Sequence, residues 1–161
     1  MGFKVRMLER VAIHGHRGSR GTCPENTPAS FEEALKAGAD FFELDTHLSA
    51  DNIPVVYHDA ALSGRLCTDE TGKRLRREIP VHKMSAEEIT HYRVGSVLDP
   101  HFPDQKQVTE VGIPLLEEVL TWLAEHKKSI GVNITAPEFF AEGLASISRD
   151  IDELERLTAK R

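Results

Sequence analysis

The stretch Phe41-Phe42-Glu43-Leu44-Asp45-Thr46-His47-Leu48 decides how this chain folds. Side chains of a β-strand alternate between its two faces, so Glu43, Asp45 and His47 share one face and mostly apolar residues share the other. This alternation predicts a strand that packs its apolar face on a core. It also predicts that two carboxylates lie together on the opposite face.

Strand and helix patterns continue before this stretch. The apolar run Val11-Ala12-Ile13 predicts a buried strand. A helix then begins with Thr27 as N-cap and Pro28 at the first helical position. It ends at Gly38, where a left-handed backbone conformation is needed.

Strand and helix patterns also alternate in the part of the chain that follows residues 41–48. Ile53 to Tyr57 predicts a further strand, residues 115 to 126 predict a helix, and residues 130 to 134 predict the next strand. Repeated alternation of strand and helix indicates an α/β fold with a parallel sheet and helices outside it. Such folds place their chemistry at the carboxyl ends of the strands.

Residues 60 to 110 have a different composition, with several glycines and prolines and many charges. Within them only Ser85 to Tyr92 predicts a helix, because Ser85 and Glu88 can form a capping box. We interpret this region as an insertion or long loop within a single domain that spans residues 1–161. Long segments of this kind are often functional.

Composition and charge limit the possible partners and location. The chain has 161 residues, 40% of them hydrophobic and 29% charged, and a net charge of −6. The one basic run, residues 73–77, is short, so a nucleic-acid partner is not expected. No secretory signal and no apolar run of roughly 20 residues is visible. We expect a cytoplasmic protein without a transmembrane segment, with Cys23 and Cys67 as reduced thiols.

Glu43 and Asp45 are the candidate metal ligands. Two carboxylates on one face repel each other unless a cation or a proton lies between them. Mg²⁺ and Ca²⁺ prefer oxygen ligands of this kind. The alternative interpretation, two carboxylates that face solvent on an edge strand, is disfavoured by the neighbouring Phe41 and Phe42.

His16 and His58 are the candidate proton-transfer residues, since each follows a predicted strand and stands next to a charged residue. One histidine can take a proton from a nucleophile while the other gives one to a leaving alkoxide. Arg17 suits a bidentate contact to phosphate. The alternatives are two surface-loop histidines and a surface ion pair.

Four other residues in these segments leave their roles open. Glu25 is a candidate for a further metal ligand. Asn26 either fixes the loop through its side-chain amide or only forms a turn before Pro28. The sequence assigns no role to His14 or His47.

Taken together, these residues resemble the glycerophosphodiester phosphodiesterase family. The matching motifs cover most of residues 11 to 123 and include His16-Arg17-Gly18, Pro24-Glu25-Asn26-Thr27, Glu43-Leu44-Asp45, Pro54-Val55-Val56-Tyr57-His58-Asp59 and Ile113-Pro114-Leu115-Leu116-Glu117-Glu118. The resemblance implies the N-terminal portion of a TIM (β/α) barrel, with a small insertion after the second strand.

The resemblance also implies the activity and the site. It implies metal-dependent hydrolysis of glycerophosphodiesters to glycerol 3-phosphate and an alcohol. Glu43 and Asp45 would bind Mg²⁺ or Ca²⁺, His16 and His58 would form the acid/base pair, and Arg17 would lie near the phosphate.

Two departures from the family pattern bear on this expectation. The family's third strand has the pattern Asn-Ile-Glu-Ile-Lys, whereas Thr135 and Pro137 stand here in place of the glutamate and the lysine. A complete barrel takes roughly 250 residues, so the resemblance predicts a truncated member. Open sheet edges invite pairing, so self-association that covers the half-barrel is one interpretation. The alternatives are a truncated or decayed gene product and a fragment.

Two alternative functions remain open at this point. The first is a non-catalytic or weakly active remnant that keeps the metal-binding and phosphate-binding loops. The second is a related barrel phospholipase of the sphingomyelinase D type.

Overall fold

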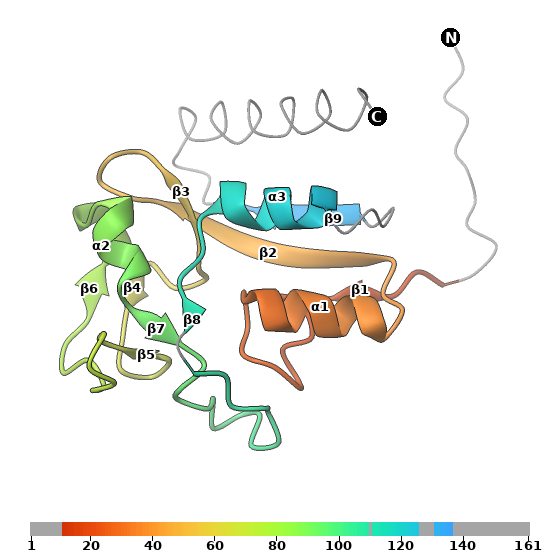
Figure 1. Ribbon diagram of the computed structural model, residues 1–161, viewed down its shortest axis with the longest axis horizontal. Coiled ribbons are helices and arrows are strands. Elements are labelled where there is room, and N and C mark those ends of the chain that lie inside the picture. Colours follow the sequence, from red (N-terminus) through yellow and green to blue (C-terminus); the bar gives the residue numbers. More distant parts are fainter. Residues whose placement is uncertain (1–10, 110, 126–130, 137–161) are drawn as a thin grey trace, which may run out of the picture.

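The central element of the fold is strand β2 (Phe41–Leu48), which has the bounds that the sequence predicts. The computed structural model describes residues 11–109, 111–125 and 131–136. In it β2 pairs in parallel with β1 (His14–Gly15) on one side and with β9 (Gly131–Thr135) on the other (Figure 1). The predicted parallel sheet is therefore confirmed.

The carboxyl end of β2 pairs instead with β3 (Pro54–Val56), in antiparallel orientation. The connection through residues 49–52 is a short turn, whereas a parallel crossover needs about a dozen residues or more. The strand predicted over Ile53 to Tyr57 therefore exists, but it extends β2 as a hairpin rather than continuing the parallel sheet.

Helices α1 (Pro28–Lys36) and α3 (Leu116–Glu125) pack on the apolar face of β2. The start of α1 is as predicted, since the Thr27 hydroxyl oxygen accepts a hydrogen bond from the Ser30 amide at 3.2 Å. Gly38 follows the helix with a φ of 81°, also as predicted. The shared core contains Phe31, Phe42, Leu44, Val56, Leu116, Val119 and Leu120. Because both helices cover this face, Glu43 and Asp45 lie on the opposite one.

The insertion gathers beside β3, at the end of the molecule away from β1 (Figure 1). Its elements are short: β4 (Ala61–Leu62), β5 (Cys67–Thr68), β6 (Ile79–Pro80), the 3-10 helix η1 (Val81–Lys83), α2 (Ala86–Thr90) and β7 (Arg93–Val94). The strand β8 (Val111–Gly112) directly follows the insertion and pairs with β7. The capping box of Ser85 and Glu88 is present as predicted. A second core of buried residues, which includes Val55, Leu62 and Ile89, joins these elements to β3.

The expectation of a buried strand at Val11-Ala12-Ile13 is wrong. Val11 and Ile13 are 87% and 53% exposed, and strand pairing begins only at His14. In the described part of the chain no strand lies along the outer edge of β1 to cover these side chains. An apolar run becomes a buried strand only where a neighbouring element covers it.

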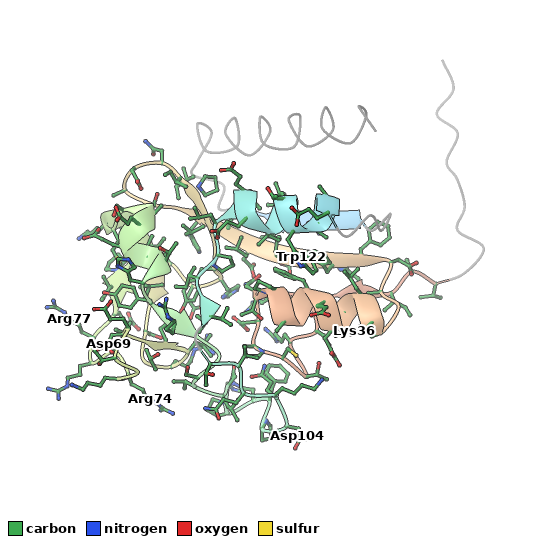
Figure 2. All side chains as sticks on the ribbon, viewed as in Figure 1. Lys36, Asp69, Arg74, Arg77, Asp104 and Trp122 are labelled. Atoms are coloured by element: carbon green, nitrogen blue, oxygen red, sulfur yellow. The ribbon has the colours of Figure 1, made fainter. Side chains whose placement is uncertain are left out.

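Several smaller expectations have clear outcomes. Cys23 and Cys67 are both free, as predicted, and both are buried. Trp122 of α3 is partly buried and packs against the core that contains Phe31 and Phe42 (Figure 2). Pro137, which stands in place of the family's lysine, lies outside the described residues. Among the described helices none is long and apolar enough to cross a membrane.

Replacing Phe42 with alanine tests the core of β2. Phe42 is fully buried and stacks on Phe31 with ring centroids 4.6 Å apart. We expect Phe42→Ala to lower the free energy of unfolding by about 3–5 kcal/mol. The neighbouring Phe41 is 40% exposed, so Phe41→Ala should lower the free energy of unfolding clearly less. Urea titrations followed by circular dichroism measure both, and equal losses would contradict this assignment of the faces.

Candidate active site

The loop that follows β1 carries Arg17 in a left-handed backbone conformation, with φ at 55°. Asn26 has the same φ, and its amide donates to the Arg17 carbonyl oxygen at 3.1 Å. The Ser30 hydroxyl donates to the same oxygen at 2.6 Å. Non-glycine residues in this conformation are uncommon and tend to cluster at functional sites. The surrounding hydrogen bonds hold the loop in this shape.

Glu43 is buried and receives hydrogen bonds on both carboxylate oxygens. The Arg17 amide donates to Oε2 at 2.9 Å, and the Thr135 hydroxyl donates to Oε1 at 3.1 Å. The Nε2 atom of His16 lies 3.8 Å from Oε2. Glu43 of β2 therefore connects this strand with the loop that follows β1 and with the end of β9.

Asp45 is held mainly by the amide side chain of Asn26. The Asn26 Nδ2 group donates to Asp45 Oδ2 at 2.9 Å, and the Asp45 backbone amide donates to Asn26 Oδ1 at 3.2 Å. The Nε atom of Arg17 lies 3.2 Å from the same Oδ2. Of the two roles left open for Asn26, the structure confirms the loop-fixing one.

Arg17, Glu25, Glu43 and Asp45 form a buried group that we name the carboxylate cluster. Arg17 Nη1 donates to Glu25 Oε1 at 2.9 Å, and both side chains are only 10% exposed. Arg20, which is more exposed, lies 3.7 Å from the other Glu25 oxygen. Three carboxylates against these two arginines leave the cluster net negative, and a buried charge imbalance is costly.

The chemistry of the carboxylate cluster fits a hard divalent cation. Among the described residues no three His, Cys, Asp or Glu side chains already stand as a ligand group, because the Arg17 guanidinium lies between Glu25 and Asp45. Mg²⁺, however, is commonly bound through one or two carboxylates, with water and substrate phosphate completing the shell. Glu43 and Asp45 supply those carboxylates on one strand face.

His58 lies just beyond the end of β3, and its ring is held by Asp59. Its Nδ1 atom is 2.7 Å from Asp59 Oδ1. Burial raises the pKa of Asp59, but hydrogen bonds from His58 and Arg65 outweigh this effect and leave the pKa below its ordinary value. An ionised carboxylate can only accept, so Nδ1 of His58 donates, and Nε2 is the atom left for chemistry.

The backbone of His58 is also tied to the site. The amide of the preceding residue, Tyr57, donates to the Asp45 carbonyl oxygen at 3.0 Å. His47 Nε2 donates to the His58 carbonyl oxygen at 2.8 Å, since a carbonyl can only accept. His47, to which the sequence analysis assigns no role, therefore positions the strand end that carries His58.

The structure thus groups the predicted residues in two sets. Arg17, Glu43 and Asp45 are in direct contact, with His16 at their exposed edge. His58 is held in a separate set by Asp59 and His47.

Comparisons with known proteins show the family of this chain. A family model for the glycerophosphoryl diester phosphodiesterase family matches residues 16–145. The chain belongs to this family. It is 33% identical over 134 residues to glycerophosphodiester phosphodiesterase 1 of Mus musculus, covering 78% of this chain and 34% of that protein.

Solved structures of the family confirm the fold. A protein from Silicibacter pomeroyi DSS-3, named as a member of this family, superposes with a TM-score of 0.83 and 31% identity, covering 90% of this chain and 54% of that one. An Oleispira antarctica phosphodiesterase in complex with sn-glycerol-3-phosphate gives a TM-score of 0.67 and 25% identity, with 88% and 52% covered. The predicted partial (β/α) barrel is therefore confirmed, and this chain spans about a third to a half of these relatives' lengths.

Replacing Gly18 with alanine tests the loop that carries Arg17. Gly18 has a φ of 79°, and an added Cβ would lie 2.7 Å from the Ser30 carbonyl carbon. We expect Gly18→Ala to lower the free energy of unfolding by about 2–4 kcal/mol. The matched control is Gly21→Ala in the same loop, where an added Cβ meets nothing within 4 Å. Thermal unfolding measures both, and a neutral Gly18→Ala would refute the loop geometry.

Proposed function

We propose that this protein hydrolyses glycerophosphodiesters to glycerol 3-phosphate and an alcohol, with a divalent cation bound at Glu43 and Asp45. The observation that carries the proposal is the net-negative carboxylate cluster built around Arg17. The family membership and the relative from Oleispira antarctica that binds sn-glycerol-3-phosphate support the substrate class.

Glu43 and Asp45 are the proposed ligands of Mg²⁺ or Ca²⁺. In the described part of the chain Asp45 Oδ1 accepts no hydrogen bond, so it is the oxygen best placed for a cation. When bound, the cation would supply charge that stabilises the developing negative charge on the phosphate oxygens. Arg17 donates to Glu25 through Nη1, and its Nε atom lies 3.2 Å from Asp45 Oδ2. We propose its Nη2 group as the donor to a phosphate oxygen.

His58 and His16 are the proposed proton-transfer pair. Asp59 fixes the proton of the neutral His58 ring on Nδ1, so Nε2 can accept a proton from the attacking group. His16 is then the residue that donates a proton to the leaving alcohol. The attacking group is either water or the neighbouring hydroxyl of the glycerol moiety.

Thr135 is the observation that favours the second candidate function, a weakly active or non-catalytic binding module. Its hydroxyl donates to Glu43 Oε1 and thereby occupies an oxygen that a cation would otherwise use. A hydroxyl at this position also adds no negative charge to the site. The same experiment distinguishes the two candidates.

The test is release of glycerol 3-phosphate from glycerophosphocholine by the purified chain, with Mg²⁺ or Ca²⁺ added. We expect metal-dependent release that falls about 10²–10³-fold in Glu43→Gln, because one charged ligand is lost. The matched control is Glu117→Gln on the exposed face of α3, which should leave the rate unchanged.

Other outcomes would redirect the proposal. No release from a folded chain that still binds the cation would support the binding module. Cleavage of intact sphingomyelin or lysophospholipid in preference to the diester would favour the sphingomyelinase D type.

Sedimentation of the active species tests the proposed self-association, which predicts a dimer or larger assembly.

Replacing Thr135 with glutamate tests the role of this position. Thr135 lies opposite Asp45 in the parallel register of β2 and β9, so a carboxylate there would join the same site. We expect Thr135→Glu to tighten divalent-cation binding by about tenfold, because a further charged ligand is added. Calorimetric titration measures this, with Thr121→Glu on the exposed side of α3 as control. Equal affinities in the two variants would be inconsistent with a site at Glu43 and Asp45.

A further inference from the structure

A chain of charged hydrogen bonds runs from His58 into the insertion. Asp59 accepts from His58 on Oδ1 and from Arg65 Nη2 on Oδ2, the latter at 2.9 Å. The Nη1 group of the same Arg65 donates to Asp99 Oδ2 at 3.0 Å. Arg65 and Asp99 are 34 residues apart, so two separate segments of the insertion meet here.

The series of hydrogen bonds ends at Asp99, which is itself held firmly in the protein. Asp99 is only 5% exposed, and its Oδ1 accepts from both the backbone amide and the ring Nδ1 of His101, at 3.0 and 2.8 Å. Burial raises the pKa of Asp99, but the hydrogen bonds from His101 outweigh it and hold the pKa below its ordinary value. Asp99 is therefore a fixed negative charge to which Arg65 can be tethered.

We propose that Arg65, tethered by Asp99, is a positioning residue for His58. The planar guanidinium donates one N–H group to each of two carboxylates, a geometry that lysine cannot reproduce. By holding Oδ2 of Asp59, Arg65 keeps Oδ1 directed at His58 Nδ1. The insertion thus helps to set which ring nitrogen of His58 carries the proton.

Exposure explains why Asp59 needs this support. The side chains of His58 and Asp59 are 40% and 31% exposed, so water competes for the bond between them. Isolated surface pairs of this kind contribute little, whereas networks with a buried anchor contribute more. Without Arg65, the Asp59 carboxylate could rotate to solvent and release the His58 ring.

The inference rests on the proposed function for its consequence in catalysis, but the position of the proton on His58 can be measured without turnover. The probe is the ¹⁵N spectrum of histidine-labelled protein at alkaline pH, where an ordinary imidazole is neutral. His58 is assigned from the signals lost in His58→Gln. We expect the Nδ1–H tautomer to predominate in the wild-type chain and to lose population to Nε2–H in Arg65→Gln.

Arg77→Gln is the matched control, because Arg77 is an exposed arginine of the same insertion that points outward (Figure 2). It should leave the His58 signals unchanged. Asp99→Asn removes the negative charge that tethers Arg65, and Arg65→Lys keeps the positive charge without the planar guanidinium. Both should shift the tautomer in the same direction as Arg65→Gln, and they carry the test if that variant does not fold.

Kinetics give a second measurement if the chain turns over glycerophosphocholine. Arg65→Gln should lower kcat by about 3- to 10-fold with little change in KM, because it disturbs the orientation of one proton-transfer group. Unchanged His58 tautomers in folded Arg65 and Asp99 variants would overturn the inference. Shifted tautomers in a chain without turnover would support it while counting against the proposed function.

Discussion

The rest of the site depends on how the carboxylates of β2 are accommodated away from water. Glu43 and Asp45 point to the same side of one strand, and both are almost fully buried. Arg17 makes this possible, because its backbone amide binds Glu43 while its guanidinium lies between Asp45 and Glu25. In that arrangement Arg17 has a left-handed backbone conformation. The next residue, Gly18, also has a positive φ and packs so closely against Ser30 that a Cβ does not fit there.

The two faces of β2 have different roles: one packs on the helices and the other carries the site carboxylates. On one side Phe42 and Leu44 hold α1 and α3, and this packing fixes where β2 lies. On the other side the same strand presents its carboxylates to the loops of β1 and to Thr135 of β9. The antiparallel hairpin to β3 then brings His58 to the same end of β2. The insertion follows immediately and supports His58 through Arg65 and Asp99.

The sequence predicted the parts of this structure that follow from local patterns. The alternation of β2, the N-cap of α1 and the capping box of α2 each depend on residues close in the chain, and each is confirmed. The site motifs predicted that Arg17, Glu43 and Asp45 belong to one site. They did not predict that Arg17 contacts both carboxylates, since Glu43 is 26 residues away in the chain. The contacts of Thr135 with Glu43 and of Arg65 with Asp99 could not be predicted, because these pairs are 92 and 34 residues apart. The exposure of Val11 was missed because burial depends on a covering element rather than on the run itself.

The central claim is that the carboxylate cluster, with its net negative charge, is a site for one divalent cation. Calorimetric titration of the chain with Ca²⁺ and with Mg²⁺ tests this claim most directly, with Asp45→Asn as the comparison. The account predicts one cation bound per chain, a higher unfolding temperature in its presence, and loss of both effects in Asp45→Asn. A folded wild-type chain that binds neither cation, or that binds one equally well after Asp45→Asn, would contradict it.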